Sequence, residues 1–490
     1  MQAPKDKYDI SFTSTTAKMP LKDKWIYGLH SGFAFQVTWV IFSYYLMYFY
    51  TDVFGISAAL AGVLMMAARL FDVFTDALIG FLIDNCHFKS GKYRSWEILG
   101  IVPLLVTFVM TFTALDTTST ALKVFWVCIS YGLFGAIGAT MEYSSSTAQL
   151  ANMTKNPAER SSAVAIKGAL QNVAQIIASV VFISMVRAFG GNAGHEARGF
   201  FLAAIVVAAI VGVCCIAMIV ITKKYELNRD GSYRKHLIGI GEGISLIQQL
   251  KDLFTLRPVI VVAGNQLVQQ SLYAIRNGIL IYLFQYYWNL ETFYDQTILI
   301  YSVAMVVGSL LLEPAVKLVG DTNRCFIVTK IISAALFVIN YIMILGMGIE
   351  GSGASMQYGA VLLIFMLIGV VMVMENVFSF SLMPGMVDYS EYKTGMNKGG
   401  MVHSMCGLSL TLGSAVGGFI FGILLENSGY VANTVQTAST QSTMLLLAFI
   451  VPAVLMILSA VIQAFYGLND KKLDEIMHEI AEKRKAEHKQ

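Results

Sequence analysis

The chain has 490 residues, of which 56% are hydrophobic and only 13% are charged, and its formal net charge is +3. Together with a mean hydropathy of +0.64, this composition excludes a soluble globular protein of ordinary type and indicates a polytopic membrane protein. The nearly neutral charge gives no support to a nucleic-acid partner.

The N-terminal segment, residues 1–24, is polar and rich in lysine, and it lacks the short apolar core of a signal peptide. We therefore expect no cleaved leader, and the first apolar run would serve as the insertion signal. The six cysteines lie in apolar runs or beside basic loops, so we expect no disulfide framework and no metal site defined by spacing. The seven histidines, His30 among them, show no ligand spacing either and are interpreted as incidental.

Twelve apolar runs are long enough to cross a bilayer, which takes about 20 residues. They cover residues 25–50, 57–84, 96–115, 121–150, 162–188, 199–222, 259–288, 294–319, 325–348, 357–384, 401–425 and 441–467. We predict an all-α integral membrane protein of twelve transmembrane helices in two six-helix bundles. The expected parts are a cytoplasmic N-terminal segment (1–24), the first bundle (25–222), a cytoplasmic central loop (223–258), the second bundle (259–467) and a cytoplasmic tail (468–490).

Lysine and arginine are concentrated in alternate loops. One side of the predicted membrane receives only Lys123, Arg187 and Arg198, and the other side receives the rest of the loop cations. Because cytoplasmic loops carry the excess of these residues, both termini are predicted to be cytoplasmic. The basic loops are interpreted as topology signals. Two sets of six spans joined by a polar loop resemble the plan of the major facilitator superfamily, whose halves surround a cavity at the membrane midplane.

Charged residues inside the predicted spans are the main functional signal. A charge at the centre of a membrane helix costs roughly 2.5–3.5 kcal/mol, so such residues face a protein interior or a wet cavity. Five stand out in the first half: Arg69, Asp72, Asp76, Glu142 and Lys167. The first three are spaced three and four residues apart and share one helix face. Paired carboxylates can bind a small cation or share a proton, although an internal salt-bridge lattice with Arg69 and Lys167 is the alternative.

The second half carries Arg276 inside its first span, close to Asn265, Gln266, Gln269 and Gln270. These residues can line a cavity, or the amides can bond between helices. Four further acids, expected at span ends within reach of water, are Glu313, Glu375, Asp388 and Glu391. Most aromatic residues of the first and seventh spans are expected to form interfacial belts; they are Trp39, Tyr44, Tyr45, Tyr48, Tyr50, Tyr282, Tyr286, Tyr287 and Trp288.

Several stretches together resemble one transporter family. They are "YYLMYFYTDVFGIS", "ARLFDVFTDALIGFLIDN" with "GKYRSW", "IRNGILIYLFQYYW", and "GMVDYSEYKTG" with "LGSAVGG". The resemblance is to the glycoside/pentoside/hexuronide:cation symporters, the melibiose permease group of the major facilitator superfamily. It implies that Asp72 and Asp76 bind the cation, that Glu142 bonds the sugar, and that Lys167 lies in the same pocket. Arg69 matches the arginine one turn before the first aspartate.

Three positions depart from that family pattern. Gln36 stands where the group has a sugar-binding aspartate, Ser146 stands where it has a stacking tryptophan, and Thr411 stands where it has a lysine. The family's cation-binding residues are therefore better matched in this chain than its sugar-binding residues. We count all three positions, with Arg69 and Arg276, among the candidate substrate-binding residues.

The sequence predicts a secondary active transporter that works by alternating access and couples a cation, Na⁺, Li⁺ or H⁺, to uptake of a sugar or glycoside. The alternative is a cation-coupled transporter of a non-sugar solute, such as an amphiphile or organic anion, on the same fold. A receptor or scaffold would not need buried paired carboxylates, and no nucleophile or acid–base constellation indicates an enzyme. We expect a monomer in the bilayer, with Na⁺ on Asp72 and Asp76 if sodium is the coupling ion, and no other cofactor.

Overall fold

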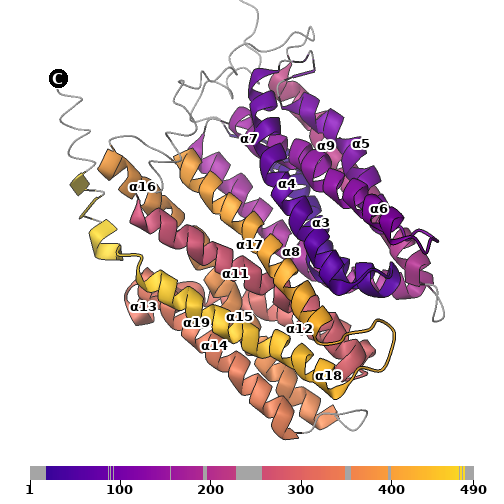
Figure 1. The fold of residues 1–490 in the computed structure, drawn as a ribbon. Helices are drawn as coiled ribbons and strands as arrows, with labels where there is room; N and C mark the ends of the chain where they lie inside the picture. The colour runs from indigo at the N-terminus through magenta and orange to yellow at the C-terminus, as the bar shows by residue number, and fades with distance from the viewer. Residues whose placement is uncertain are drawn as a thin grey trace, which may run out of the picture. The chain divides into compact units, whose positions relative to one another are not determined.

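The computed structural model describes residues 18–227 and 256–479, apart from gaps at residues 87, 89, 92, 155, 191–195, 348–354, 395–398, 474 and 477. Within these ranges the chain is almost entirely helical (Figure 1). Each of the twelve predicted runs lies on helix over most of its length, and nine helices in the described ranges are long and apolar enough to cross a membrane. The predicted all-α membrane fold is confirmed.

The chain divides into two compact units, residues 1–241 and 242–490. The division falls inside the predicted central loop, of which residues 228–255 lie outside the described residues. The first 17 residues and the last part of the tail, from residue 480, lie outside them as well.

Unit 1 contains the helices of the first six predicted spans. The first and fourth spans change from α-helix to π-helix (η) along their length. In chain order the elements are α2 (Leu21–Gly28), η1 (Leu29–Ala34), α3 (Phe35–Tyr48), η2 (Phe49–Val53), α4 (Ala58–Asn85), α5 (Arg94–Thr111), α6 (Thr120–Leu133), η3 (Phe134–Ser144), α7 (Ser145–Met153), α8 (Pro157–Gly190) and α9 (Glu196–Glu226).

Unit 2 contains the helices of the other six predicted spans. In chain order its elements are α11 (Arg257–Tyr282), η5 (Leu283–Tyr287), α12 (Glu291–Leu310), α13 (Leu312–Val319), α14 (Thr322–Met347), α15 (Ser355–Ser381), α16 (Met383–Thr394), α17 (Gly399–Asn427), α18 (Ala438–Leu445), η6 (Leu446–Ile450) and α19 (Val451–Ala464).

Short polar caps begin several of these helices. The Ser57 hydroxyl accepts a hydrogen bond from the Leu60 amide at the start of α4, and Ser119 does the same for α6. A side-chain oxygen at this position satisfies one of the amides that a helix leaves unpaired. Gly55, with a φ of +71°, provides the left-handed residue that turns the chain between η2 and α4. These signals fix where α4, which carries the paired aspartates, begins.

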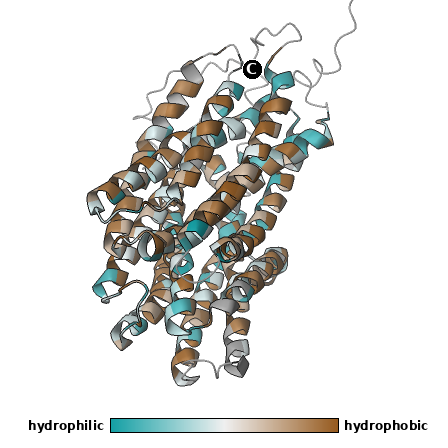
Figure 2. Cartoon of the chain, turned by 90° about the vertical axis from the view of Figure 1, so that its right-hand side faces the viewer, coloured by the Kyte–Doolittle hydropathy of each residue, from teal (hydrophilic) through white to brown (hydrophobic). Residues whose placement is uncertain are grey.

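The helices present hydrophobic residues along most of their length (Figure 2). Many large apolar side chains are exposed, for example Val213 at 67% and Leu310 at 74%. Such extensive exposure is unfavourable in water and is expected of helices that face lipid. Inside unit 1, Gly138 of η3 packs so closely on α5 that a Cβ there would lie 2.6 Å from the Leu104 backbone. Small residues permit this close approach between membrane helices.

A polar network joins the first helix of unit 1 to its last. Asp23 of α2 forms an ion pair with Lys224 of α9 at 2.6 Å and accepts a hydrogen bond from the Tyr225 hydroxyl. On the same helix, Lys24 forms an ion pair with Glu159 of α8 at 2.7 Å. The Lys24 ammonium lowers the pKa of the Glu159 carboxyl from its usual value. These contacts hold α2 against both α8 and α9.

Candidate functional site

Asp72 and Asp76 lie one turn apart on α4, as the spacing predicts. Asp72 is buried, whereas Asp76 is exposed. The two carboxylates interact electrostatically. Within the described ranges, Asp72 Oδ1 has no hydrogen-bond partner. The pair therefore offers one buried carboxylate oxygen that no described residue bonds, and carboxylate oxygens are the ligands that a small hard cation prefers.

Arg69 neutralises part of this negative charge. Its Nη1 donates to Asp72 Oδ2 at 3.3 Å. The guanidinium carbon lies 5.1 Å from the ring centroid of Trp39 on α3 and 5.5 Å from that of Tyr131 on α6. Cation–π contacts with two rings hold the guanidinium beside Asp72. One arginine for two carboxylates leaves one negative charge for a monovalent cation.

The π-helix η3 forms the opposite wall of this site. The Thr140 hydroxyl donates to Asp76 Oδ1 at 2.6 Å. A Cβ at Gly135 would lie 2.4 Å from Asp72 Oδ1. The Asp72 carboxylate can therefore occupy this position only because residue 135 has no side chain. Sequence reasoning missed both residues, because neither is ionisable. Isolated π-helical turns recur at functional sites, but nothing in the sequence pattern distinguishes η3 from an ordinary helix.

Glu142, also on η3, is wholly buried and faces His30 of η1. Its Oε1 lies 3.0 Å from His30 Nε2. Cys215 of α9 completes the cluster, with the three donor atoms all within 4.8 Å of one another. The interpretation of His30 as incidental is wrong, because this histidine of η1 pairs with a buried acid of η3. The position of His30 inside an apolar run was the sequence signal that could have marked this histidine as functional or paired.

Lys167 lies half-buried on α8, and its ammonium makes no ion pair or hydrogen bond with any described residue. Its backbone lies against helix η1, where a Cβ at Gly32 would be 2.6 Å from the Lys167 carbonyl oxygen. The proposed salt-bridge lattice thus holds for Arg69 and Asp72, while Lys167 neutralises neither aspartate in this structure. Its placement in one pocket with Glu142 stays a prediction.

The two positions of unit 1 that depart from the family pattern have different environments. Gln36 of α3 is half-buried, and its amide donates to Gln175 Oε1 of α8 at 2.8 Å. Ser146 of α7 is fully buried and accepts a hydrogen bond from the Ser31 hydroxyl at 3.2 Å. A tryptophan ring would not fit at Ser146 without overpacking the bundle.

The aromatic residues of the first span are not an interfacial belt. The tyrosines of α3 and η2 lie inside unit 1, and in unit 2 the same holds for the rings at the end of the seventh span. The buried rings are Tyr44, Tyr45, Tyr48, Tyr50, Tyr282, Tyr286 and Trp288. They pack on other rings in the bundle interiors, for example Tyr45 on Phe182. The expectation was wrong because both α3 and α11 are covered by neighbouring helices rather than by lipid.

In unit 2, Arg276 of α11 is only 2% exposed. Its guanidinium carbon lies 3.8 Å from the ring centroid of Tyr301, and Nη1 donates to Asn277 Oδ1 at 3.2 Å. Nε and Nη2 have no partner among the residues that the structure describes. Thr411 of α17 is half-buried and donates to the Gly407 carbonyl at 3.3 Å.

The amides of α11 serve in part as bonds between helices. Gln269 Oε1 accepts from Ser379 of α15 at 2.9 Å, and Asn265 accepts from Ser459 of α19. Gln266 is buried, and in the described part of the chain its amide has no partner. The interhelical interpretation therefore applies to Gln269 and Asn265, and a cavity lined by these amides stays a prediction.

Glu375 was expected at a span end within reach of water, and this expectation is wrong. It is fully buried in α15, where the Ser333 hydroxyl of α14 donates to its Oε1 at 2.5 Å. Lys330 of α14, which the sequence analysis did not select, is also fully buried, donates to Ser459 at 2.7 Å and interacts electrostatically with Glu375. The charges of these two residues are thus balanced inside unit 2.

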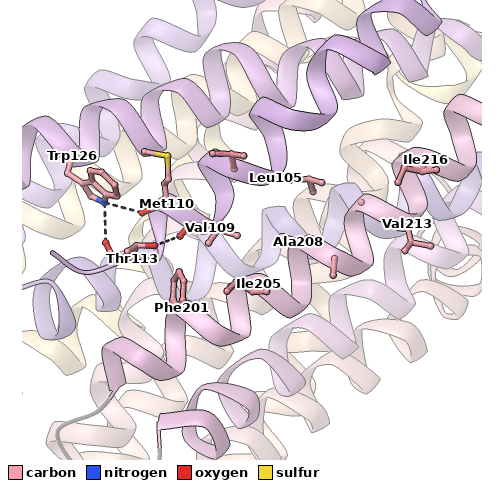
Figure 3. A pocket seen from close by; sticks show the side chains of 13 residues that line it. Leu105, Val109, Met110, Thr113, Trp126, Phe201, Ile205, Ala208, Val213 and Ile216 are labelled. Carbon is pink, nitrogen blue, oxygen red and sulfur yellow. Dashed lines mark hydrogen bonds between the residues drawn. The ribbon is translucent and has the colours of Figure 1, made fainter.

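A groove on unit 1 lies apart from all of these residues. It has a volume of 660 Å³ and is lined by α5, α6 and α9, with Leu105, Val109 and Phe201 among its side chains (Figure 3). Its lining contains no charged residue. At one end the Trp126 indole N–H donates to the carbonyls of Met110 and Thr113, each at 3.1 Å. Such a lining suits a hydrocarbon chain rather than a sugar.

Comparison with known proteins identifies the family. A family model described as MFS/sugar transport protein matches residues 27–470. The chain belongs to this family. The family's members are transporters, in agreement with the intramembrane charges.

Relatives of the MFS/sugar transport family match along nearly the whole chain. The isoprimeverose transporter of Lactiplantibacillus pentosus is 28% identical over 462 residues, which cover 92% of this chain and 89% of that protein. The glucuronide carrier protein homolog of Escherichia coli K12 is 28% identical, with 90% and 92% covered. The putative glycoside/cation symporter YagG of the same organism is 26% identical, with 96% and 97% covered.

Solved structures agree on the fold. The nucleoside transporter NupG matches with a TM-score of 0.59 and 14% identity over 91% of this chain and 100% of that one. A POT family transporter in complex with 5-aminolevulinic acid matches with a TM-score of 0.60 and 11% identity over 95% and 100%. At such low identity these matches establish the architecture and nothing about the substrate.

Proposed function

We propose that this member of the MFS/sugar transport family is a cation-coupled symporter of a sugar or glycoside that works by alternating access. The observation that carries the proposal is the buried Asp72 carboxylate, whose Oδ1 lies against Gly135 and has no hydrogen-bond partner among the residues that the structure describes. The name of YagG, a putative glycoside/cation symporter, supports both halves of the proposal. The non-sugar alternative has no comparable support among these names.

Asp72 and Asp76 are the proposed cation ligands, with Thr140 beside them. Arg69 cancels one of the two negative charges, so a single Na⁺, Li⁺ or H⁺ leaves the site neutral and limits the cost of burying it. No further cofactor is proposed. Each positive charge that moves inward across about 100 mV contributes roughly 2.3 kcal/mol, which corresponds to about fiftyfold accumulation of the sugar.

The proposed substrate-binding residues are the candidates selected from the sequence. They are Gln36, Arg69, Glu142, Ser146, Lys167, Arg276 and Thr411. Among the described residues, the Lys167 ammonium and the Arg276 nitrogens Nε and Nη2 have no hydrogen-bond partner. This supports a role in hydrogen bonding to hydroxyl or acidic groups of a glycoside. Glu142 and Ser146 are fully buried in this structure, so contact with the substrate requires their side chains to turn.

We further propose that the protein is a monomer in the cell membrane with both termini in the cytoplasm. The distribution of lysine and arginine between the loops supports this orientation. The orientation can be tested with reporters that are fused to the C-terminus and are active on only one side of the membrane. A reporter signal from the outer side alone would contradict the proposed orientation.

The transport proposal is tested by uptake of labelled sugars into proteoliposomes that carry an imposed gradient of Na⁺, Li⁺ or H⁺. Wild-type protein should accumulate a sugar or glycoside with one of these gradients, and Asp72→Asn and Asp76→Asn should lose the stimulation. Asp116→Asn, at an exposed loop position, is the matched control and should behave as wild type. Gradient-independent uptake by the wild type, or full stimulation in both aspartate variants, would refute the proposal.

A further inference from the structure

The cluster of His30, Glu142 and Cys215 lies where three helical spans of unit 1 meet. Each of the three residues has 0% of its surface exposed. His30 Nε2 and Glu142 Oε1 are 3.0 Å apart. One ligand atom from each of His30, Glu142 and Cys215 lies within 4.8 Å of the other two. Three different potential ligands thus converge on one point from η1, η3 and α9.

Within the described residues, Glu142 Oε2 and His30 Nδ1 have no hydrogen-bond partner. A buried polar group without a partner is costly and seldom persists without a reason. The unpartnered Glu142 oxygen is the second observation that points to a missing ligand at this position.

The donor set selects the kind of ligand. An imidazole nitrogen, a carboxylate oxygen and a thiolate sulfur are the ligands of Zn²⁺ and of similar thiophilic metals, whereas Mg²⁺ and Ca²⁺ require more oxygen atoms. Around a tetrahedral Zn²⁺ with bonds of about 2.0–2.3 Å, neighbouring ligand atoms stand roughly 3.3–3.7 Å apart. The His30–Glu142 separation of 3.0 Å is just below that range and the other separations are at most 4.8 Å, so small side-chain movements complete the geometry.

Charge balance supports the same choice. A divalent metal with one carboxylate, one thiolate and one neutral imidazole carries no net charge, and a neutral complex avoids the penalty of a buried charge. On binding, the thiol proton is replaced by the metal and released. We propose that His30, Glu142 and Cys215 form a binding site for a thiophilic divalent metal such as Zn²⁺ or Cd²⁺, separate from the paired aspartates of α4.

A metal at this point would link the first, fourth and sixth spans of unit 1. Because it would bind the folded chain and have no preformed site in the unfolded one, it should raise the melting temperature of the protein. Because Glu142 is also among the proposed substrate-binding residues, the test relies on metal binding rather than on transport.

The test uses the full chain in detergent, without a purification tag, titrated with Zn²⁺ or Cd²⁺ alone. We expect one metal ion per chain after desalting, a higher melting temperature, and with Cd²⁺ the ultraviolet absorption of a metal–thiolate bond. Cys215→Ser and His30→Gln should each weaken binding at least tenfold. Cys214→Ser, which changes the adjacent and less buried thiol, is the matched control and should bind as wild type.

A variant that keeps Cys215 as its only cysteine covers the case in which Cys215→Ser does not fold. It should retain the metal–thiolate absorption and the bound ion. Loss of both in this folded variant, equal binding in the wild type and Cys215→Ser, or no bound metal in the wild type would each overturn the proposal. Binding that survives all the cysteine changes would locate the metal elsewhere and would overturn it as well.

Discussion

Replacing Gly135 with alanine should damage the proposed cation site without disturbing the fold. The added Cβ would lie 2.4 Å from Asp72 Oδ1, 2.5 Å from Oδ2 and 2.7 Å from Cγ. Ordinary contact begins at 3.4 Å, so the carboxylate has to move by about 1 Å. Hard cations hold oxygen ligands within a range of only a few tenths of an ångström, about 2.3–2.6 Å for Ca²⁺. The shift therefore removes a ligand.

The expected loss of cation-binding free energy is that of one interaction with a charged group, about 1.5–3 kcal/mol. This corresponds to a cation affinity that is roughly 10–150-fold weaker. Alanine favours a helix over glycine by about 1 kcal/mol, so insertion and expression should be kept. The assay is a titration of sugar uptake with the cation that stimulates the wild type, and the quantity compared is the half-saturating cation concentration.

Gly132→Ala is the matched control, because Gly132 precedes Gly135 by less than one turn and its added Cβ would meet no atom within 4 Å. This variant should titrate as wild type. If Gly135→Ala also gives the wild-type half-saturating concentration in folded protein, then Asp72 does not ligate the cation from its present position, and the reasoning is refuted.

Three other changes test contacts away from the aspartates. Gly32→Ala should lower the melting temperature by overpacking η1 on the α8 backbone, at a cost of about 1–3 kcal/mol, whereas Gly168→Ala on α8 meets no atom and should not. Glu159→Gln should slightly lower the melting temperature at neutral pH and reduce the fall of the melting temperature in acid. The pKa of Glu159 is lowered in the folded protein. The stabilisation by its ion pair with Lys24 is therefore present above the pKa of Glu159 in the unfolded chain and is lost as the pH falls through its pKa in the folded protein. Glu375→Gln should cost about 3–5 kcal/mol by leaving the Lys330 charge uncompensated, and the added Lys330→Met should restore much of the melting temperature; equal stability of the single and double variants would contradict the pairing.

Hydropathy predicted the membrane fold well, because each span has to satisfy its backbone within itself and therefore appears as a continuous apolar run. The contact between Arg69 and Asp72 was also predictable, since it lies within one helix and depends only on spacing. The aromatic positions show the limit of this approach. An aromatic run near a span end has the same pattern whether lipid or another helix covers it.

Contacts between spans were not predictable from spacing. Glu142 meets His30, and Glu375 lies near Lys330, only because particular helices pack side by side. Each of these residues appears in the sequence as an isolated polar position within an apolar run. A rule that every ionisable residue inside a span has a partner would have flagged His30 and Lys330, although it would not have named the partner.

The links from the first helix of unit 1 to later helices bear on how the protein is made. His30 pairs with Glu142 of η3, and Asp23 pairs with Lys224 and Tyr225 at the end of α9. A chain that emerges from the ribosome in order therefore carries its first span with unmet polar groups until the sixth has been synthesised. Nascent chains halted before α9 should stay open to proteases and insertion chaperones, and those halted after it should become resistant in one step, because a domain closes as a whole.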